Sequence, residues 1–199
     1  MTRLLLIRHA ESVWNAERRW QGRADPPLSV TGRRDAKRAS AALQGLVDAV
    51  YASPQLRARE TAALLTGGID IHVDDDLREI DIGEFTGLTT DEVNERYADE
   101  LAAYRSGEAD SVPGGETRGA MFQRVMAALD RIAASPHERV LVVTHGGAIS
   151  TLERHFDIHP GEGAGNLSGR WFEHDGVLRP DPERVHLIRD EHEAAPEAR

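Results

Sequence analysis

The sequence predicts an α/β fold: a three-layer α/β/α sandwich around a mainly parallel sheet. Short apolar runs alternate with longer segments whose apolar residues recur at helical spacing. Residues 140–143 are apolar and mostly β-branched, which is typical of a parallel strand covered by helices on both faces. Because each apolar strand and stripe must be buried against another layer, the alternation indicates helices packed on both faces of one sheet.

The amino-terminal half is assigned as strand 3–7, loop 13–28, helix 31–46, strand 49–52, helix 56–66 and strand 69–73. The loop assignment rests on Gly22 and on the adjacent Pro26 and Pro27. Thr31 is a plausible N-cap for the first helix, and Gly67 with Gly68 ends the second.

The carboxyl-terminal half is assigned as helix 89–104, loop 106–115, helix 116–134, strand 140–143, helix 148–155, a hairpin over 171–178 and a last strand 185–188. The helix 116–134 has the clearest apolar stripe, which includes Met121, Val125 and Leu129. Residues 77–87 hold too many glycines and charges for an assignment, and we expect residues 190–199 to be a disordered tail.

The composition excludes several classes of protein. Hydrophobic residues make up 40% of the 199 residues and charged residues 29%, a balance typical of one globular domain. No apolar run approaches the ~20 residues of a membrane-spanning helix, and Arg8, His9 and Glu11 interrupt the only early apolar stretch. With no cysteine, disulfide scaffolds, iron–sulfur clusters and thiol catalysis are excluded. We therefore expect a cytoplasmic protein with no membrane partner.

The net charge of −10 is unevenly distributed. Residues 70–110 hold 14 acidic residues against three arginines, whereas residues 1–69 hold 11 basic residues against six acidic ones. The acidic block argues against nucleic-acid binding, which usually leaves a basic footprint. The basic first third suits an anionic small molecule.

Two histidines follow predicted strands directly. His9 follows strand 3–7, and His145 follows strand 140–143 and precedes two glycines that open a helix. Arg8 lies beside the first histidine, and Arg57 follows strand 49–52 after a short turn. Since parallel strands end at the same edge of a sheet, these groups should meet there with a helix N-terminus, which describes a phosphate pocket. Metal binding by the histidine pair is a weaker reading, because the two arginines would repel a cation, there is no cysteine, and no predicted helix carries a His-x-x-x-His pair.

The motifs resemble those of the histidine phosphatase superfamily, in its phosphoglycerate mutase-like branch. Residues 6–12 with Trp14 and Asn15 resemble the signature R-H-G-E-[TS]-x-W-N, with Ala10 in place of the glycine. Further matching blocks follow in order at residues 21–32, 53–62, 77–87, 113–116 and 143–147. The resemblance covers the chain from Leu4 to about Ile188 and implies the phosphoglycerate mutase-like fold.

The resemblance implies a metal-independent, cofactor-free enzyme of the histidine acid phosphatase type, which hydrolyses phosphate monoesters through a phosphohistidine on His9. It implies that Arg8, Arg57 and His145 bind the phosphoryl oxygens and that Glu79 is the general acid. The remaining residues expected to bind phosphate or substrate are Asn15, Gln21, Gly22 and Gly146. The expected organisation is a single domain over residues 1–189 with a lid-like insertion around 82–113.

Two alternatives share the same residues: a cofactor-dependent phosphoglycerate mutase, and a catalytically silent domain that binds phosphate for regulation. The mutases of this family are longer, so the length of 199 residues favours the short phosphatases. The expected partner is a small phosphate ester of unspecified identity. An exposed edge strand in this fold often pairs, which is compatible with a homodimer.

Overall fold

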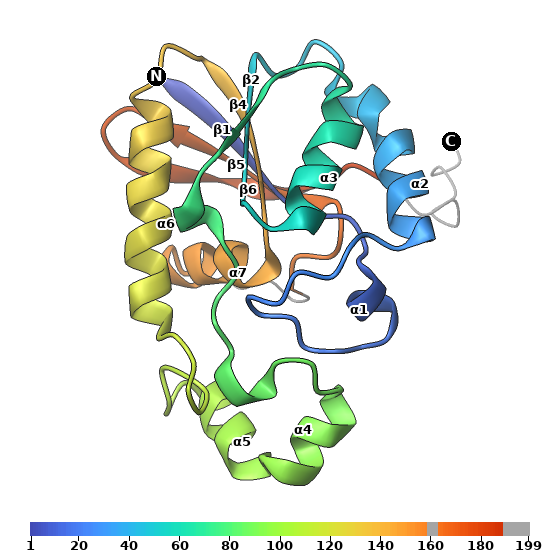
Figure 1. Ribbon diagram of the computed structural model, residues 1–199. Helices are drawn as coiled ribbons and strands as arrows, with labels where there is room; N and C mark the ends of the chain where they lie inside the picture. Colours follow the sequence, from blue (N-terminus) through green and yellow to red (C-terminus); the bar gives the residue numbers. More distant parts are fainter. Residues whose placement is uncertain (159–162, 189–199) are drawn as a thin grey trace, which may run out of the picture.

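The computed structural model describes residues 1–158 and 163–188, and Figure 1 shows their arrangement. A six-stranded sheet in the order β3-β2-β4-β1-β5-β6 forms the middle layer. Its strands are β1 (Thr2–Arg8), β2 (Ala49–Ala52), β3 (Ile71–Val73), β4 (Arg139–Thr144), β5 (Ser168–His174) and β6 (Leu178–His186). The first four are parallel, and β5 and β6 join as antiparallel neighbours. The predicted sandwich with a mainly parallel sheet is confirmed.

The two central strands alternate their side chains between the two helical layers. Leu4 and Leu6 of β1 belong to one apolar cluster, and Leu5 and Ile7 belong to the other. All four are fully buried, as is the apolar part of β4. Burial on both faces explains why these strands read as continuous apolar runs in the sequence.

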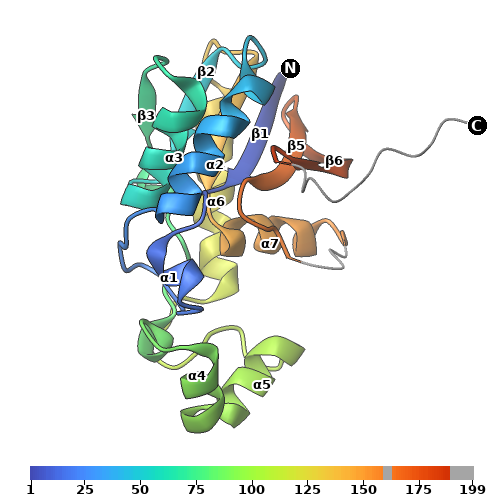
Figure 2. The same ribbon diagram turned by 90° about the vertical axis from the view of Figure 1, so that its right-hand side faces the viewer.

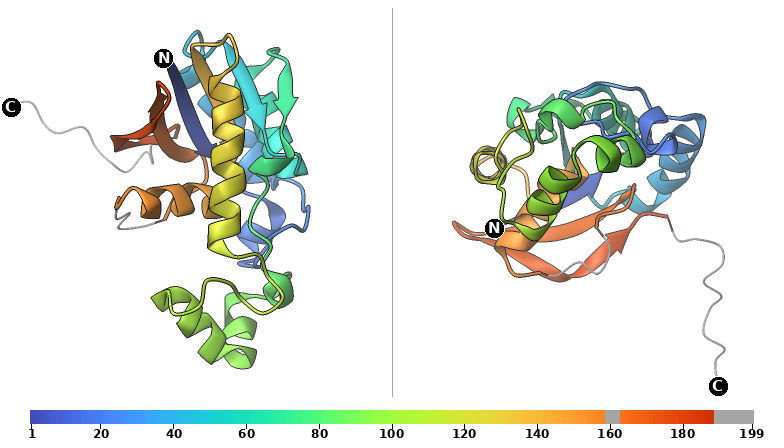
Figure 3. Two further views of the ribbon diagram at one scale, coloured as in Figure 1. Left: turned by 90° about the vertical axis from the view of Figure 1, so that its left-hand side faces the viewer. Right: turned by 90° about the horizontal axis from the view of Figure 1, so that it is seen from below.

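Four helices cover the sheet. α2 (Val30–Ala39) and α3 (Leu56–Thr66) pack on one face, and α6 (Arg118–Ala133) and α7 (Gly146–His155) pack on the other. Figures 1 and 3 show α6 lying across the sheet, on the side opposite α3. The predicted helices 56–66 and 116–134 correspond to α3 and α6, whereas the predicted helix 31–46 is α2 followed by a short 3₁₀ helix, Ser40–Leu43.

One loop assignment and one further helix assignment also differ from the structure. The predicted loop 13–28 begins with a short helix α1 (Val13–Ala16), because Ser12 and Asn15 form a reciprocal capping box. The predicted helix 89–104 is two helices, α4 (Thr90–Arg96) and α5 (Ala98–Ser106), because Tyr97 leaves helical geometry with φ −139°. The Tyr97 ring instead packs on Phe85, with ring centroids 5.3 Å apart.

The predicted separate strand 185–188 is wrong. Its first two residues are the end of β6, a single strand that runs on from the hairpin and pairs with β5. Pro180 and Pro182 lie within it. They are tolerated because β6 is the last strand of the described sheet, so an N–H group on its outer side has no strand to bond to.

The segment between β3 and α6 lies beyond the carboxyl ends of the parallel strands. Figure 2 shows α4 and α5 there, below the sheet, and α1 lies at the same end. This segment includes the residues expected to form a lid, and its role as a lid stays a prediction. Among the described residues no helix is long and apolar enough to cross a membrane. The cytoplasmic location stays a prediction, and the expected tail 190–199 falls outside the described residues.

Substitution of Gly169 in β5 tests the close contact between β1 and β5. A Cβ at this position would overlap the carbonyl oxygen of Leu6 on the neighbouring strand. We expect Gly169→Ala to lower the free energy of unfolding by about 2 kcal/mol, the usual scale for overpacking. Gly68→Ala is the matched control, because no atom lies within 4 Å of a Cβ there. Urea denaturation of both variants measures the difference, and equal stabilities would contradict this packing.

Candidate active site

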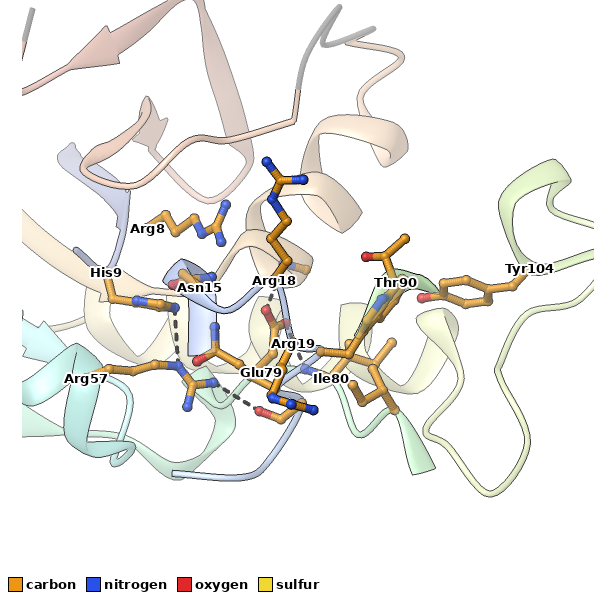
Figure 4. Close-up of a pocket in the computed structure, with 15 residues that line it drawn as sticks. Arg8, His9, Asn15, Arg18, Arg19, Arg57, Glu79, Ile80, Thr90 and Tyr104 are labelled. Carbon is orange, nitrogen blue, oxygen red and sulfur yellow. Dashed lines mark hydrogen bonds between the residues drawn. The ribbon is translucent and has the colours of Figure 1, made fainter. Parts of the chain in front are cut away.

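A cavity of about 360 Å³ lies at the carboxyl ends of β1 and β4. It is shown in Figure 4 and is large enough for a small organic ligand. The residues that line it are Arg8, His9, Asn15, Arg18, Arg19, Trp20, Gln21, Gly22, Arg57, Glu79, Ile80, Ile82, Thr90, Tyr104 and Gly147. Four arginines face one carboxylate among these residues, so the cavity is suited to an anion.

His9 lies at the end of β1 and is 2% exposed. Its Nδ1 lies 2.7 Å from the carbonyl oxygen of Ala10, and its Nε2 lies 3.2 Å from Nε of Arg57. A carbonyl oxygen only accepts and a guanidinium only donates, so Nδ1 carries the proton and Nε2 carries the lone pair. Burial, followed by the charges of Arg57 and Arg8, lowers the pKa of His9 well below its usual value. The ring is therefore held neutral, with its lone pair on Nε2.

Arg57 is fully buried beside His9 (Figure 4). Its two terminal nitrogens donate to the carbonyl oxygens of Ala24 and Gly22, at 2.6 and 3.0 Å. Burial lowers the pKa of Arg57 to about 10, an effect that Glu79 and Asp25 partly oppose. The guanidinium still carries its charge at neutral pH, and backbone dipoles rather than a close carboxylate are its main partners.

Arg8 ends β1 and extends along the same cavity. It donates from Nη1 to the carbonyl oxygen of Ala164 at 2.8 Å, which fixes the guanidinium. Its Nε is buried and has no hydrogen-bond partner among the residues that the structure describes. A buried donor without a partner is costly, so this nitrogen favours binding of an anion.

His145 lies behind the cavity wall and is fully buried. Its ring centroid lies 5.2 Å from that of His9, and its Nε2 lies 2.8 Å from the hydroxyl of Ser53. Its Nδ1 is a second buried nitrogen without a partner in the described part of the chain. Burial, then Arg57, lowers the pKa of His145 well below its usual value, so this ring is also neutral.

Glu79 reaches the cavity from the segment that follows the short 3₁₀ helix Asp75–Leu77. One carboxyl oxygen accepts the N–H of Ile80 at 2.9 Å, and the other accepts the N–H of Gly147 at 3.1 Å. Gly147 is in the first turn of α7, so the positive end of that helix faces the carboxyl group. These two hydrogen bonds fix the direction of the Glu79 side chain.

The remaining predicted site residues lie close by, with different contacts. Asn15 and Gln21 line the cavity; the side-chain oxygen of Asn15 accepts the backbone N–H of Ser12, and that of Gln21 accepts the Ser12 hydroxyl. Gly22 has φ +48°, and a Cβ there would lie 2.5 Å from Ile82, so only glycine fits this turn. Gly146 was expected to offer its N–H to an anion, but Gly147 is the glycine that lines the cavity.

Comparison with known proteins identifies the family to which the chain belongs. The model of the histidine phosphatase superfamily (branch 1) matches residues 4–169. The chain belongs to this superfamily. Phosphoglycerate mutase-like protein 4 of Arabidopsis thaliana is 36% identical over 157 residues, which cover 75% of this chain and 68% of that protein. The uncharacterized phosphatase PhoE of Bacillus subtilis is 32% identical over 156 residues, which cover 76% of each.

The solved structure of a phosphatase agrees with the fold. The mycobacterial glucosyl-3-phosphoglycerate phosphatase, solved with VO3, superposes with a TM-score of 0.80 at 28% identity. The superposition covers 91% of this chain and 98% of that one. The resemblance inferred from the motifs is confirmed, and these similarities support a phosphatase-type enzyme.

Sequence reasoning missed residues that hold the histidine phosphatase site together. Gln55 accepts the backbone N–H of Glu79 at 2.8 Å and donates to the carbonyl oxygen of Gly22 at 3.0 Å. Asn166 donates to the carbonyl oxygen of His9 at 2.8 Å. Gln55 belongs to a block that matched the family, but Asn166 carried no signal, because it meets His9 only through the fold.

The described residues around this site do not form a metal centre. Within residues 1–158 and 163–188, no group of three or more His, Asp or Glu side chains is arranged to hold an ion. Arg8 and Arg57 also place positive charge beside the two histidines. Independence from metals stays a prediction, which the assays below test.

The protonation of His9 can be followed directly by NMR. Because its pKa is lowered, His9 should stay neutral, with the proton on Nδ1, from about pH 7.5 to about pH 5.5, a range spanning the usual histidine pKa of about 6.5. Long-range ¹H–¹⁵N spectra measure this, with His9→Gln to assign the signals. Arg57→Gln should raise the pKa of His9, because one opposing charge is lost. Titration of His9 near its usual pKa in the wild-type protein would contradict this electrostatic description.

Proposed function

We propose that the protein is a metal-independent phosphatase that hydrolyses small-molecule phosphate monoesters through a phosphohistidine on His9. The proposal includes a catalytic domain over residues 1–189 acting in the cytoplasm. The observation that carries it is the state of His9, a neutral imidazole whose Nε2 lone pair lies among buried arginines. A neutral nitrogen nucleophile next to fixed positive charge is what attack on an anionic phosphoryl group requires.

When the ester binds, the hydrogen-bond partners of Arg57 and His9 change. The hydrogen bond from Arg57 to His9 Nε2 is 3.2 Å long, and the phosphoryl group displaces it. Arg57 then binds phosphoryl oxygens together with Arg8, whose Nε is a free donor. If Ser53 donates its hydroxyl hydrogen to His145 Nε2, then Nδ1 of His145 carries a proton and is another donor to the phosphoryl group.

The first chemical step forms the phosphohistidine. The Nε2 lone pair of His9 bonds to phosphorus as the bond from phosphorus to the ester oxygen breaks. The leaving oxygen takes a proton from Glu79, so an alcohol is released rather than an alkoxide. The carbonyl of Ala10 accepts a hydrogen bond from Nδ1–H and stabilises the positive charge that develops on the ring.

The second step returns the enzyme to its starting state. Water attacks phosphorus while the Glu79 carboxylate takes one of its protons. The bond from phosphorus to Nε2 breaks, and its electron pair returns to His9. Inorganic phosphate leaves, Glu79 is protonated again, and neither step requires a metal ion.

The mutase reading uses the same residues, and the Arabidopsis thaliana relative is named mutase-like. The phosphatase reading is supported by the relative named as a phosphatase and by the mycobacterial phosphatase, which this chain covers over 98% of its length. The substrate of that neighbour is its own, and we propose only a small phosphate monoester for this chain. Pairing through an edge strand, as in a homodimer, stays a prediction.

Assays of phosphate release test the proposed function. With a panel of phosphate monoesters, release should be unaffected by EDTA and independent of added 2,3-bisphosphoglycerate. His9→Ala should keep its fold by circular dichroism and lose all but a few per cent of the activity, because no other side chain is placed to carry the phosphoryl group. Interconversion of 3-phosphoglycerate and 2-phosphoglycerate faster than phosphate release would establish the mutase instead.

Glu79→Gln tests the proton donor. It keeps the shape of the side chain and removes the transferable proton. An alkyl phosphate should form phosphoenzyme roughly 10²–10⁴-fold more slowly in this variant, the usual size of a general-acid contribution. Para-nitrophenyl phosphate should lose much less, because para-nitrophenolate is stable without a proton.

Rapid-quench measurement of the phosphohistidine burst separates the two steps. Steady-state rates would mix them, since Glu79 also activates water in the second step. Equal losses in the burst for both esters would rule out Glu79 as the acid, and Asp81 and Glu84 would be the next residues to vary.

A further inference from the structure

The segment that carries Glu79 is held by side chains rather than by regular backbone pairing. It lies between the 3₁₀ helices Asp75–Leu77 and Gly83–Phe85 and belongs to no strand or longer helix. The carbonyl oxygen of Leu77 accepts the hydroxyl of Thr144 at 2.9 Å. Backbone groups inside a protein need partners, so the neighbouring carbonyls must be satisfied in a similar way.

Arg124 of α6 supplies those partners. Its Nη1 donates to the carbonyl oxygens of Asp76 and Arg78, at 2.7 and 2.6 Å. Its Nη2 donates to the carbonyl oxygen of Glu79 at 3.2 Å. One guanidinium therefore binds one carbonyl of the preceding 3₁₀ helix and two carbonyls of this segment, and the last of them belongs to the candidate acid itself.

The Arg124 guanidinium is fixed by a carboxylate on its other side. Its Nε and Nη2 donate to the two carboxyl oxygens of Glu116, at 2.7 and 2.9 Å. Both side chains are largely buried, 15% and 12% exposed. A planar guanidinium in such a two-point pair keeps one orientation, so the carbonyls it binds also keep theirs.

The backbone of Glu79 is thereby fixed on both sides of its Cα atom. Gln55 binds its N–H, and Arg124 binds its carbonyl oxygen. The Glu79 side chain faces the cavity, whereas Arg124 is not among the residues that line it (Figure 4). Arg124 does not line the cavity, but it fixes the position of the backbone from which the Glu79 side chain extends.

We infer that Arg124 is a positioning residue for proton transfer, which it controls by fixing the backbone of Glu79. The inference rests on the proposed function, because it needs Glu79 to be the proton donor. A general acid acts only within hydrogen-bond reach of the leaving oxygen, and a displacement of 1 Å costs on the order of 10²-fold in rate. Loss of Arg124 frees the Glu79 carbonyl and lets its carboxyl group move by such a distance.

The leaving group distinguishes positioning from a general structural role. We expect Arg124→Gln to slow phosphoenzyme formation by about 10²-fold for an alkyl phosphate and by less than about threefold for para-nitrophenyl phosphate. In the double variant, Arg124→Gln should add less than about threefold to the loss caused by Glu79→Gln, because residues that act through one group are not additive. Rapid-quench bursts for both esters measure all four proteins.

Arg131→Gln is the matched control. Arg131 lies on the same helix and binds the carboxylates of Asp74 and Asp76, so it contacts the 3₁₀ helix that leads into the segment. It is half exposed and reaches no backbone carbonyl of Glu79. We expect bursts within about twofold of wild type for both esters, the size expected where only an exposed ion pair is lost.

The outcomes distinguish a failure of the positioning role of Arg124 from a failure of the assignment of Glu79 as the acid. If Glu79→Gln already affects both esters equally, the acid assignment fails. If Glu79→Gln is selective but Arg124→Gln slows both esters equally, or neither, the positioning role is overturned. Circular dichroism and urea denaturation check folding of each variant. Should Arg124→Gln fail to fold, Arg124→Lys keeps a charge beside Glu116 without the planar fork, and the same selective loss, smaller in size, is expected from it.

Discussion

The structure of the site depends on one constraint, which is that the charge of Arg57 is buried next to a neutral histidine. Arg57 is fully buried, and its nearest carboxylate, on Asp25, lies 4.0 Å away and is half exposed. The carbonyls of Gly22 and Ala24 supply most of its hydrogen bonds, so the loop after α1 must fold over it. Buried charge without a close counter-ion is costly. Under the proposed function, the phosphoryl group of the substrate supplies the missing negative charge, so the charge of Arg57 is already in place before that ligand binds.

The same constraint keeps His9 reactive. An imidazolium beside Arg57 and Arg8 would add a third positive charge at a buried position, so the ring stays neutral. The hydrogen bond to the Ala10 carbonyl then decides which nitrogen keeps the lone pair. Thr61 supports this turn, because its hydroxyl accepts the Ala10 N–H and donates to the Arg57 carbonyl. One hydroxyl thus joins the backbone next to His9 to the backbone of Arg57.

Much of the fold and the centre of the site could be predicted from the sequence, for identifiable reasons. The apolar runs of β1 and β4 are continuous because both faces are buried, and His9 and His145 follow them directly, so the edge of the sheet brings both histidines together. The break at Tyr97 could not be predicted, because helical spacing continues through it and only packing on Phe85 reveals it. Gln55, Asn166 and Arg124 act on backbone groups 24 to 157 residues away. A local sequence pattern does not indicate which distant carbonyl a side chain will bind.

The outer wall of the cavity joins two segments that are far apart in the sequence. The backbone of Trp20 pairs with Gly87 and Leu88 along this wall: the N–H of Gly87 donates to the Trp20 carbonyl, and the N–H of Trp20 donates to the carbonyl of Leu88, both at 2.8 Å. Arg19 adds a side-chain bond to the Gly87 carbonyl at 2.8 Å. The loop after α1 and the segment before α4 therefore form one paired edge. A change in either segment alters the same wall, so both segments jointly set the size of the cavity on this side, whereas Arg8 and Arg57 lie on the sheet side. Under the proposed function, this wall limits the leaving group and those arginines bind the phosphoryl group.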